Sequence, residues 1–108
     1  MTRITMLAAR TTAFLRSVAI VALLFAAGCE SMPVQEMSDA RQATTAAKEA
    51  GAEEHAAEEL LAAEESLHSA EKYLSSRNYA VARREALEAK AQAIDALRRS
   101  EASREEQN

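Results

Sequence analysis

The chain has 108 residues and a formal net charge of −4, with 48% hydrophobic and 4% aromatic residues. This length is enough for one small domain and excludes a large enzyme core. The acidic balance also excludes a basic nucleic-acid-binding surface, so we expect no nucleic acid among its partners.

The composition changes at Cys29. Residues 1–28 contain three arginines and no acid, whereas residues 29–108 contain 17 acids and 10 bases, which gives a net charge of −7. In this second piece Ala, Glu, Lys, Leu and Arg make up 50 of 80 residues, and only nine residues are Leu, Ile, Val or Phe. Such a bias excludes a β protein and favours long helices or a coiled coil.

Residues 1–28 have the layout of an export signal. A basic, acid-free stretch reaches Arg16, an unbroken apolar run covers residues 18–27, and small residues follow up to Gly28. The apolar run is about half the roughly 20 residues that a membrane-spanning helix needs. We therefore expect a cleaved signal peptide rather than a retained transmembrane anchor.

Cys29 is the only cysteine, which excludes an intrachain disulfide. Its place directly after Ala-Ala-Gly resembles the lipobox of bacterial lipoproteins, although Ala26 stands where Leu is commoner. The resemblance implies that the thiol of Cys29 is acylated with diacylglycerol and that signal peptidase II cuts ahead of it. Two or three acyl chains hold a protein on a bilayer, since each buried CH₂ contributes about 0.8 kcal/mol. The alternative is an ordinary secretory signal followed by a free thiol.

The residue after the cysteine bears on sorting. An aspartate there resembles the inner-membrane retention signal of enteric bacteria, whereas this chain has Glu30. By that resemblance the mature protein is anchored in the outer membrane and faces the periplasm. Residues 29–33 form a short tether, because the four residues after the cysteine reach at most about 13 Å.

A first helix is expected over residues 34–50. Pro33 suits the start of a helix, where its missing N–H costs nothing. Gly51 is the only glycine after Cys29 and marks the expected C-terminal stop. Between these two residues, four side chains fall at helical spacing: Met37, Ala40, Thr44 and Ala47.

A second helix is expected over residues 56–75, after a connection at residues 51–55. Leu and Ala alternate along it at steps of four and three, which is a two-position heptad seam. The seam consists of Ala56, Leu60, Ala63, Leu67, Ala70 and Leu74. A polar turn at residues 75–78 follows, with Asn78 placed to cap the next helix.

A third helix is expected over residues 79–103, with a polar tail at residues 104–108. It begins its own seam at Tyr79 and continues with five alanines, the alanine stripe: Ala82, Ala86, Ala89, Ala93 and Ala96. Leu87, Ile94 and Leu97 flank the stripe. Methyl-sized side chains let another helix approach closely, so we expect the second helix to pack antiparallel on this stripe.

The charges agree with that arrangement. Residues 36–76 carry ten acids and three bases, whereas residues 77–108 carry six acids and seven bases. Each exposed ion pair contributes only about 0–1 kcal/mol, so the charges select neighbours more than they stabilise. The predicted fold class is all-α: a short antiparallel helical hairpin or three-helix bundle with alanine-rich, coiled-coil-like seams.

Three pieces of the chain resemble a known family: the cysteine of the lipobox, the string "AKEAGAEEHAAEELLAAEESLHSAEKYL" and the string "RNYAVARREALEAKAQAIDALRR". The resemblance is to an alanine-rich bacterial lipoprotein family catalogued as a domain of unknown function. Its members show Gly-Ala, an aromatic residue and Ala-Pro before the second helix, and Gly-Asp-Tyr before the third. Here Gly51-Ala52 matches, His55 replaces the aromatic residue, Ala56-Ala57 replaces Ala-Pro, and Arg77-Asn78-Tyr79 replaces Gly-Asp-Tyr. The family implies a short helical bundle, sometimes ahead of an OmpA-type domain, and no reaction.

Candidate sites for chemistry are few. Glu65 and His68 have the Glu-x-x-His spacing of di-iron bundles, but such a site needs a second motif and two more carboxylates. We interpret His55 as a loop-packing or capping residue, and we see no base beside a serine that could support nucleophilic catalysis. We therefore expect no metal, no cofactor and no catalytic residue.

The sequence favours a non-enzymatic outer-membrane lipoprotein that serves as a periplasm-facing interaction or structural module. Its expected partners are the membrane, through the lipid on Cys29, and an envelope protein or a second copy of the chain. The alternative is a small envelope protein that binds a ligand, lipid or metal between its helices, which would require inward-facing polar groups.

Overall fold

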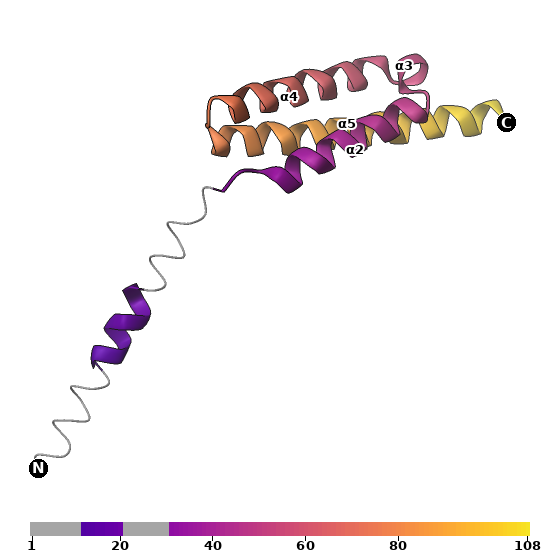
Figure 1. The fold of residues 1–108 in the computed structure, drawn as a ribbon. Coiled ribbons are helices and arrows are strands. Elements are labelled where there is room, and N and C mark those ends of the chain that lie inside the picture. Colours follow the sequence, from indigo (N-terminus) through magenta and orange to yellow (C-terminus); the bar gives the residue numbers. More distant parts are fainter. Residues whose placement is uncertain (1–11, 21–30) are drawn as a thin grey trace, which may run out of the picture. The chain divides into compact units, whose positions relative to one another are not determined.

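The computed structural model describes residues 12–20 and 31–108. These fall into two compact units, one ending at Ser31 and the other spanning Met32–Asn108. In the first unit residues 12–20 are helical. The second unit holds four labelled helices (Figure 1): α2 (Val34–Glu49), α3 (Ala52–His55), α4 (Ala57–Ser75) and α5 (Tyr79–Gln107).

The second unit confirms the predicted all-α fold class, and no strand occurs in residues 12–20 or 31–108. Helices α4 and α5 form an antiparallel hairpin, and α2 lies along both, parallel to α5 (Figure 1). None of the helices in the described residues is both long and apolar enough to span a bilayer.

The turn after α2 depends on Gly51. This residue has a φ of +88°, in the left-handed region that L-residues rarely adopt, and its N–H donates to the carbonyl of Lys48 at 3.0 Å. A Cβ built on Gly51 would also lie 3.4 Å from Cδ2 of His55. The connection expected at residues 51–55 is therefore not a plain loop, because the chain turns at Gly51 and immediately forms the single helical turn α3.

The turn between α4 and α5 has the same kind of C-terminal cap, without a glycine. Arg77 has a φ of +63°. The Asn78 N–H donates to the Tyr73 carbonyl at 2.9 Å, and the Arg77 N–H donates to the Leu74 carbonyl at 3.1 Å, which together make a Schellman motif. Asn78 occupies the N-cap of α5, but its side chain makes no capping hydrogen bond, so the expected cap is present in position only.

The C-terminal end of α5 corrects one expectation. The polar tail expected at residues 104–108 is helical up to Gln107. Residues 101–107 contain no glycine or proline, and Glu, Arg, Ala and Gln are good helix formers. Polar composition alone therefore did not mark the end of this helix.

Candidate functional site

The residues expected to carry the lipid and the sorting signal, Cys29 and Glu30, lie outside the described residues. The signal peptide expected at residues 1–28 is described only at residues 12–20. The geometry of the expected helix-packing residues, in contrast, is fully described.

The alanine stripe of α5 forms the centre of the bundle. Its five alanines are 0% exposed, whereas Tyr79, at the first position of the same seam, is half-buried. Leu87 beside the stripe is 51% exposed, and Ile94 and Leu97 are half-buried. On the side of α5, methyl groups alone therefore cover the backbone at these five positions.

The Leu/Ala seam of α4 faces the same centre. Leu60 is 4% exposed and Ala63 and Ala70 are 0% exposed. Leu67 and Leu74 are half-buried and pack against the buried cluster. The alanines of this seam are thus more completely buried than most of its leucines, which is consistent with helices that approach closely.

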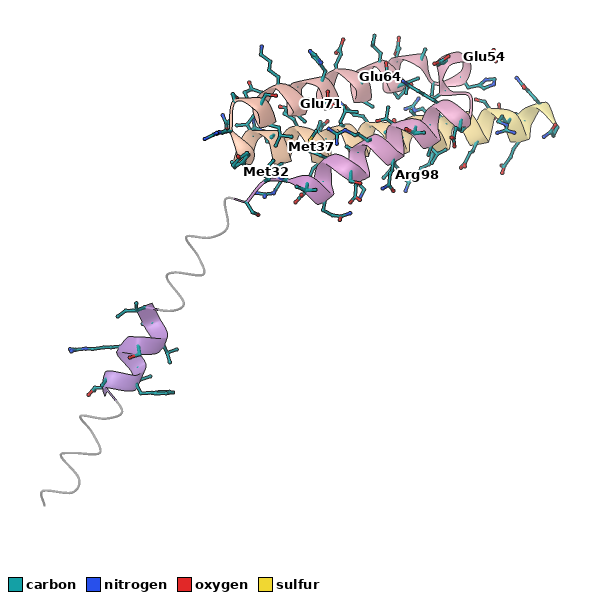
Figure 2. All side chains as sticks on the ribbon, in the orientation of Figure 1. Met32, Met37, Glu54, Glu64, Glu71 and Arg98 are labelled. Carbon is teal, nitrogen blue, oxygen red and sulfur yellow. The ribbon has the colours of Figure 1, made fainter. Side chains whose placement is uncertain are left out.

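Helix α2 also packs against the alanine stripe. The pairing expected from the two seams involved only the second and third helices. Met37, at 1% exposure, packs in one cluster with Ala70 of α4 and with Ala86 and Ala89 of α5 (Figure 2). Toward the other end of α2, Ala47 packs in a second cluster with Leu60 and Ala96. The alanine stripe therefore serves two helices at once.

Ser100 is a packing residue that the sequence reasoning missed. It is 0% exposed, and its hydroxyl donates to the carbonyl of Ala96 at 2.8 Å. Thr44 is 5% exposed and donates to the carbonyl of Ala40 in the same way, at 2.8 Å. The signal that could have identified Ser100 is its position, four residues after Ala96, because a serine bonded to its own helix packs almost as an alanine does.

Ion pairs between the helices surround this interior, and we call them the charged rim. Two of them fix α2 against α4: Arg41–Glu71 at 3.3 Å and Lys48–Glu64 at 2.6 Å. Lys48 lies seven residues after Arg41 on α2, whereas Glu64 lies seven residues before Glu71 on α4. The two helices are therefore antiparallel, with a heptad register between them. Figure 2 labels Glu64 and Glu71 on α4.

The remaining pairs of the rim reach α5. Glu36–Arg83 at 3.1 Å and Asp39–Lys90 at 3.3 Å join α2 to α5, and Glu59–Arg99 at 3.1 Å joins α4 to α5. In each pair the base lies on α5, as the charge distribution of the sequence favours. The hydroxyl of Ser66 on α4 also donates to Oε1 of Gln92 on α5 at 2.8 Å. Ser66 lies seven residues after Glu59, and Gln92 lies seven residues before Arg99, so this contact repeats the antiparallel register of the Glu59–Arg99 pair.

Two groups in the rim titrate away from their ordinary range. A hydrogen bond from Gln35, together with the nearby ammonium of Lys90, lowers the pKa of Asp39. The carboxylate of Glu64, bonded to the ammonium of Lys48, raises the pKa of Lys48. Both shifts favour the charged forms that make the ion pairs.

The candidate metal motif does not gather ligands. Glu65 and His68 are both exposed on α4, and no group of three or more His, Cys, Asp or Glu that could hold a metal occurs within residues 12–20 and 31–108. His55 lies at the end of α3, where its side chain is 20% exposed and Nε2 lies 3.9 Å from a carboxylate oxygen of Glu54. This position is consistent with a packing residue of the turn.

The family match follows the helical unit. A family model described as "Domain of unknown function (DUF4398)" matches residues 35–108, nearly the whole of α2 to α5. No curated protein and no solved structure matches the chain.

Proposed function

The chain belongs to the family of the domain of unknown function DUF4398, and we propose that this member is a non-enzymatic outer-membrane lipoprotein whose helical bundle faces the periplasm. The observation that carries the proposal is the position of Cys29. It directly follows Ala-Ala-Gly and precedes the compact unit, which begins at Met32, by three residues. A lipid on Cys29 would hold the bundle directly at the membrane surface.

The chemistry of the bundle supports a structural or interaction role. Among the described residues no buried side-chain N or O atom lacks a hydrogen-bond partner. The buried hydroxyls of Thr44 and Ser100 donate to carbonyls of their own helices. Polar groups that could act on a substrate would have to lie on the surface, where several of the acids and bases form the ion pairs of the rim.

The alternative is a binding protein that holds a ligand, lipid or metal between its helices. It would need space and polar groups turned inward. The space between α2, α4 and α5 is instead filled by alanine methyl groups and a few larger apolar side chains, among them Met37 at 1% exposure and Leu60 at 4%. We therefore favour the lipoprotein module.

The surface offers places for a partner or for self-association. Leu87 on α5, for example, is 51% exposed. We propose that the module acts by binding an envelope protein or a second copy of itself. In-cell crosslinking of the lipidated protein, with sedimentation of the purified form, distinguishes these two partners.

Metabolic labelling tests the anchor. A fatty-acid analogue should label the wild-type chain and should not label Cys29→Ser, and the labelled protein should sediment with the outer membrane. Ser31→Ala serves as a control that keeps the thiol and should be labelled like the wild type. Equal labelling of Cys29→Ser and wild type would overturn the proposal, and so would a labelled protein found only in the inner membrane.

A further inference from the structure

Three features of one end of the bundle point to a surface beyond the packing described above. The first is a group of exposed apolar side chains: Met32 at 53% exposure, Val34 at 67% and Tyr73 at 36%. Met32 and Val34 lie where the chain enters α2, and Tyr73 lies in the last turn of α4. Figure 1 shows that the start of α2 and the turn between α4 and α5 lie at the same end.

The second feature is the charge at this end. Residues 72–84, which form the last turn of α4, the connecting turn and the start of α5, contain four bases and no acid. Glu71 and Glu85 flank this segment, and Glu36 of α2 lies at the same end, where it pairs with Arg83 at 3.1 Å. Lys72 and Arg77 are both exposed and belong to none of the interhelical ion pairs described above. At the opposite end, residues 49–65 contain seven glutamates and no lysine or arginine. Figure 2 shows Met32 at one end of the bundle and Glu54 at the other.

The third feature is the distance to the proposed lipid. Only two residues lie between Cys29 and Met32, so the separation is three residue steps of at most about 3.6 Å each, or at most about 11 Å. A lipid on Cys29 therefore brings Met32, and with it this end of the bundle, to the headgroups of the bilayer.

We propose that this end of the bundle, formed by Met32, Val34, Lys72, Tyr73 and Arg77, docks onto a bilayer surface that contains anionic phospholipid. The inference rests on the proposed lipid anchor and goes beyond it, because an anchor alone leaves the orientation of the bundle open. Tyrosine and exposed aliphatic side chains favour the interfacial region of a bilayer, and lysine and arginine favour its anionic headgroups. The end with α3 then points away from the membrane.

The experiment uses tryptophan as a depth probe, since the chain has no tryptophan of its own. The mature lipidated protein carries either Tyr73→Trp or, as the matched control on the same helix, Leu61→Trp. Position 61 is exposed and lies twelve residues away along α4, which is about 18 Å. Both proteins are placed in vesicles of phosphatidylcholine and phosphatidylglycerol, with brominated lipid as the quencher.

We expect the emission of the tryptophan at position 73 to shift to the blue and to be quenched by brominated lipid, and the emission of the tryptophan at position 61 to do neither. Replacing Lys72 and Arg77 with glutamine should weaken docking about 25-fold. Each basic residue near an anionic surface contributes about fivefold, which corresponds to about 1 kcal/mol. The matched control, Arg98→Gln with Arg104→Gln, removes two exposed bases of α5 far from this end and should leave the quenching unchanged.

Four outcomes would overturn the inference: no quenching at position 73, equal quenching at positions 73 and 61, quenching that ignores the loss of Lys72 and Arg77, or equal quenching in vesicles of phosphatidylcholine alone. Fatty-acid labelling of the same preparations separates the two proposals. A chain that is not labelled at Cys29 removes the anchor itself. A labelled chain without quenching at position 73 removes only the docked orientation.

Discussion

Helix α5 presents two different regions to its neighbours. One is the alanine stripe, which is 0% exposed and touches both α2 and α4. The other is the set of bases on its flanks, Arg83, Lys90 and Arg99, which reach acids of those same helices. The two regions lie side by side on one helix, but the physical forces that act on them differ in size.

In the interior, shape decides. Burying a methyl group yields little free energy, so the bundle depends on close approach and on the few larger side chains that fill the space. On the rim, each charge is partly hydrated and each long side chain loses rotamer freedom when it is paired. The comparison teaches that a substitution in the interior should change stability severalfold more than a substitution in the rim, although the rim makes the more conspicuous contacts.

The largest effect is expected from Met37→Ala. Met37 is the largest side chain buried below 2% exposure, and its loss leaves a cavity between α2, α4 and α5. Such truncations cost about 2–5 kcal/mol. Urea unfolding of the fragment of residues 30–108, followed by circular dichroism, measures the change. The matched control is Met32→Ala, which removes the same atoms from a 53% exposed position and should be nearly neutral. Equal losses in the two variants would contradict the view that packing around Met37 holds the three helices together.

The next effect is expected from Ala89→Leu, which tests the interior by adding atoms. Ala89 is 0% exposed in the middle of the stripe, so a leucine there should push the helices apart and cost about 1–3 kcal/mol. A domain of this size has a total stability of about 3–5 kcal/mol, so thermal unfolding should show a large shift.

Two controls accompany Ala89→Leu. Ala91→Leu lies two residues further along α5 on its exposed side, and Ala102→Leu lies near the C-terminal end, also exposed. Leucine and alanine differ little in helix propensity, so both should be nearly neutral. If Ala89→Leu were as stable as the wild type and monomeric, the stripe would not be a close contact and the distinction between interior and rim would fail.

The turn between α4 and α5 offers a smaller effect of opposite sign. Arg77 is held at a φ of +63°, which costs an L-residue about 1–2 kcal/mol, while glycine loses about 0.5–1 kcal/mol more freedom on folding. Arg77→Gly should therefore raise the free energy of unfolding by up to about 1 kcal/mol. Ser76→Gly, at a neighbouring position with a φ of −85°, should lower it instead. If Arg77→Gly did not stabilise, the backbone of this turn would not be the strained part of the surface.

Much of the fold could be predicted, because alanine and leucine recur periodically and the residues that start and end the helices are easily recognised. The spacing of Met37, Ala40 and Ala47 and the two heptad seams each identify the face of a helix that the structure buries. Gly51 ends α2 as a left-handed residue should. These features depend on the local geometry of a helix or a turn, which can be inferred from residue spacing and residue type.

The features that could not be predicted depend on contacts with a third helix or on the backbone conformation of a turn. A three-helix bundle was one of the two predicted forms, and the charges favoured the first helix beside the third. The seams of α4 and α5 explain one another, however, and did not indicate that α2 packs on the same alanine stripe. The expected stripe ended at Ala96 and so did not include Ser100, whose burial depends on a neighbouring helix rather than on its own polarity. The left-handed Arg77 has no sequence signal of its own, although the resembling family carries a glycine at this position.

The smallest effect is expected from the rim, whose ion pairs are compared here with the alanine interior. Glu36–Arg83 is the least exposed of the interhelical ion pairs described above, with side chains 29% and 30% exposed and Nε 3.1 Å from Oε1. A double-mutant cycle with Glu36→Gln and Arg83→Gln isolates the coupling of the two charges, which should be about 0.2–1 kcal/mol in favour of the pair and should fall with added salt.

The same cycle on Arg41–Glu71 is the control for exposure. That pair also joins α2 to a neighbouring helix, but its side chains are 52% and 45% exposed and its atoms are 3.3 Å apart. Water screens it more completely, so its coupling should be smaller still and close to the error of the measurement. A coupling above about 2 kcal/mol for Glu36–Arg83 would equal the expected cost of Ala89→Leu. The charges would then hold the bundle together as firmly as its alanine interior does, and acid or high salt alone should separate α2 from α5.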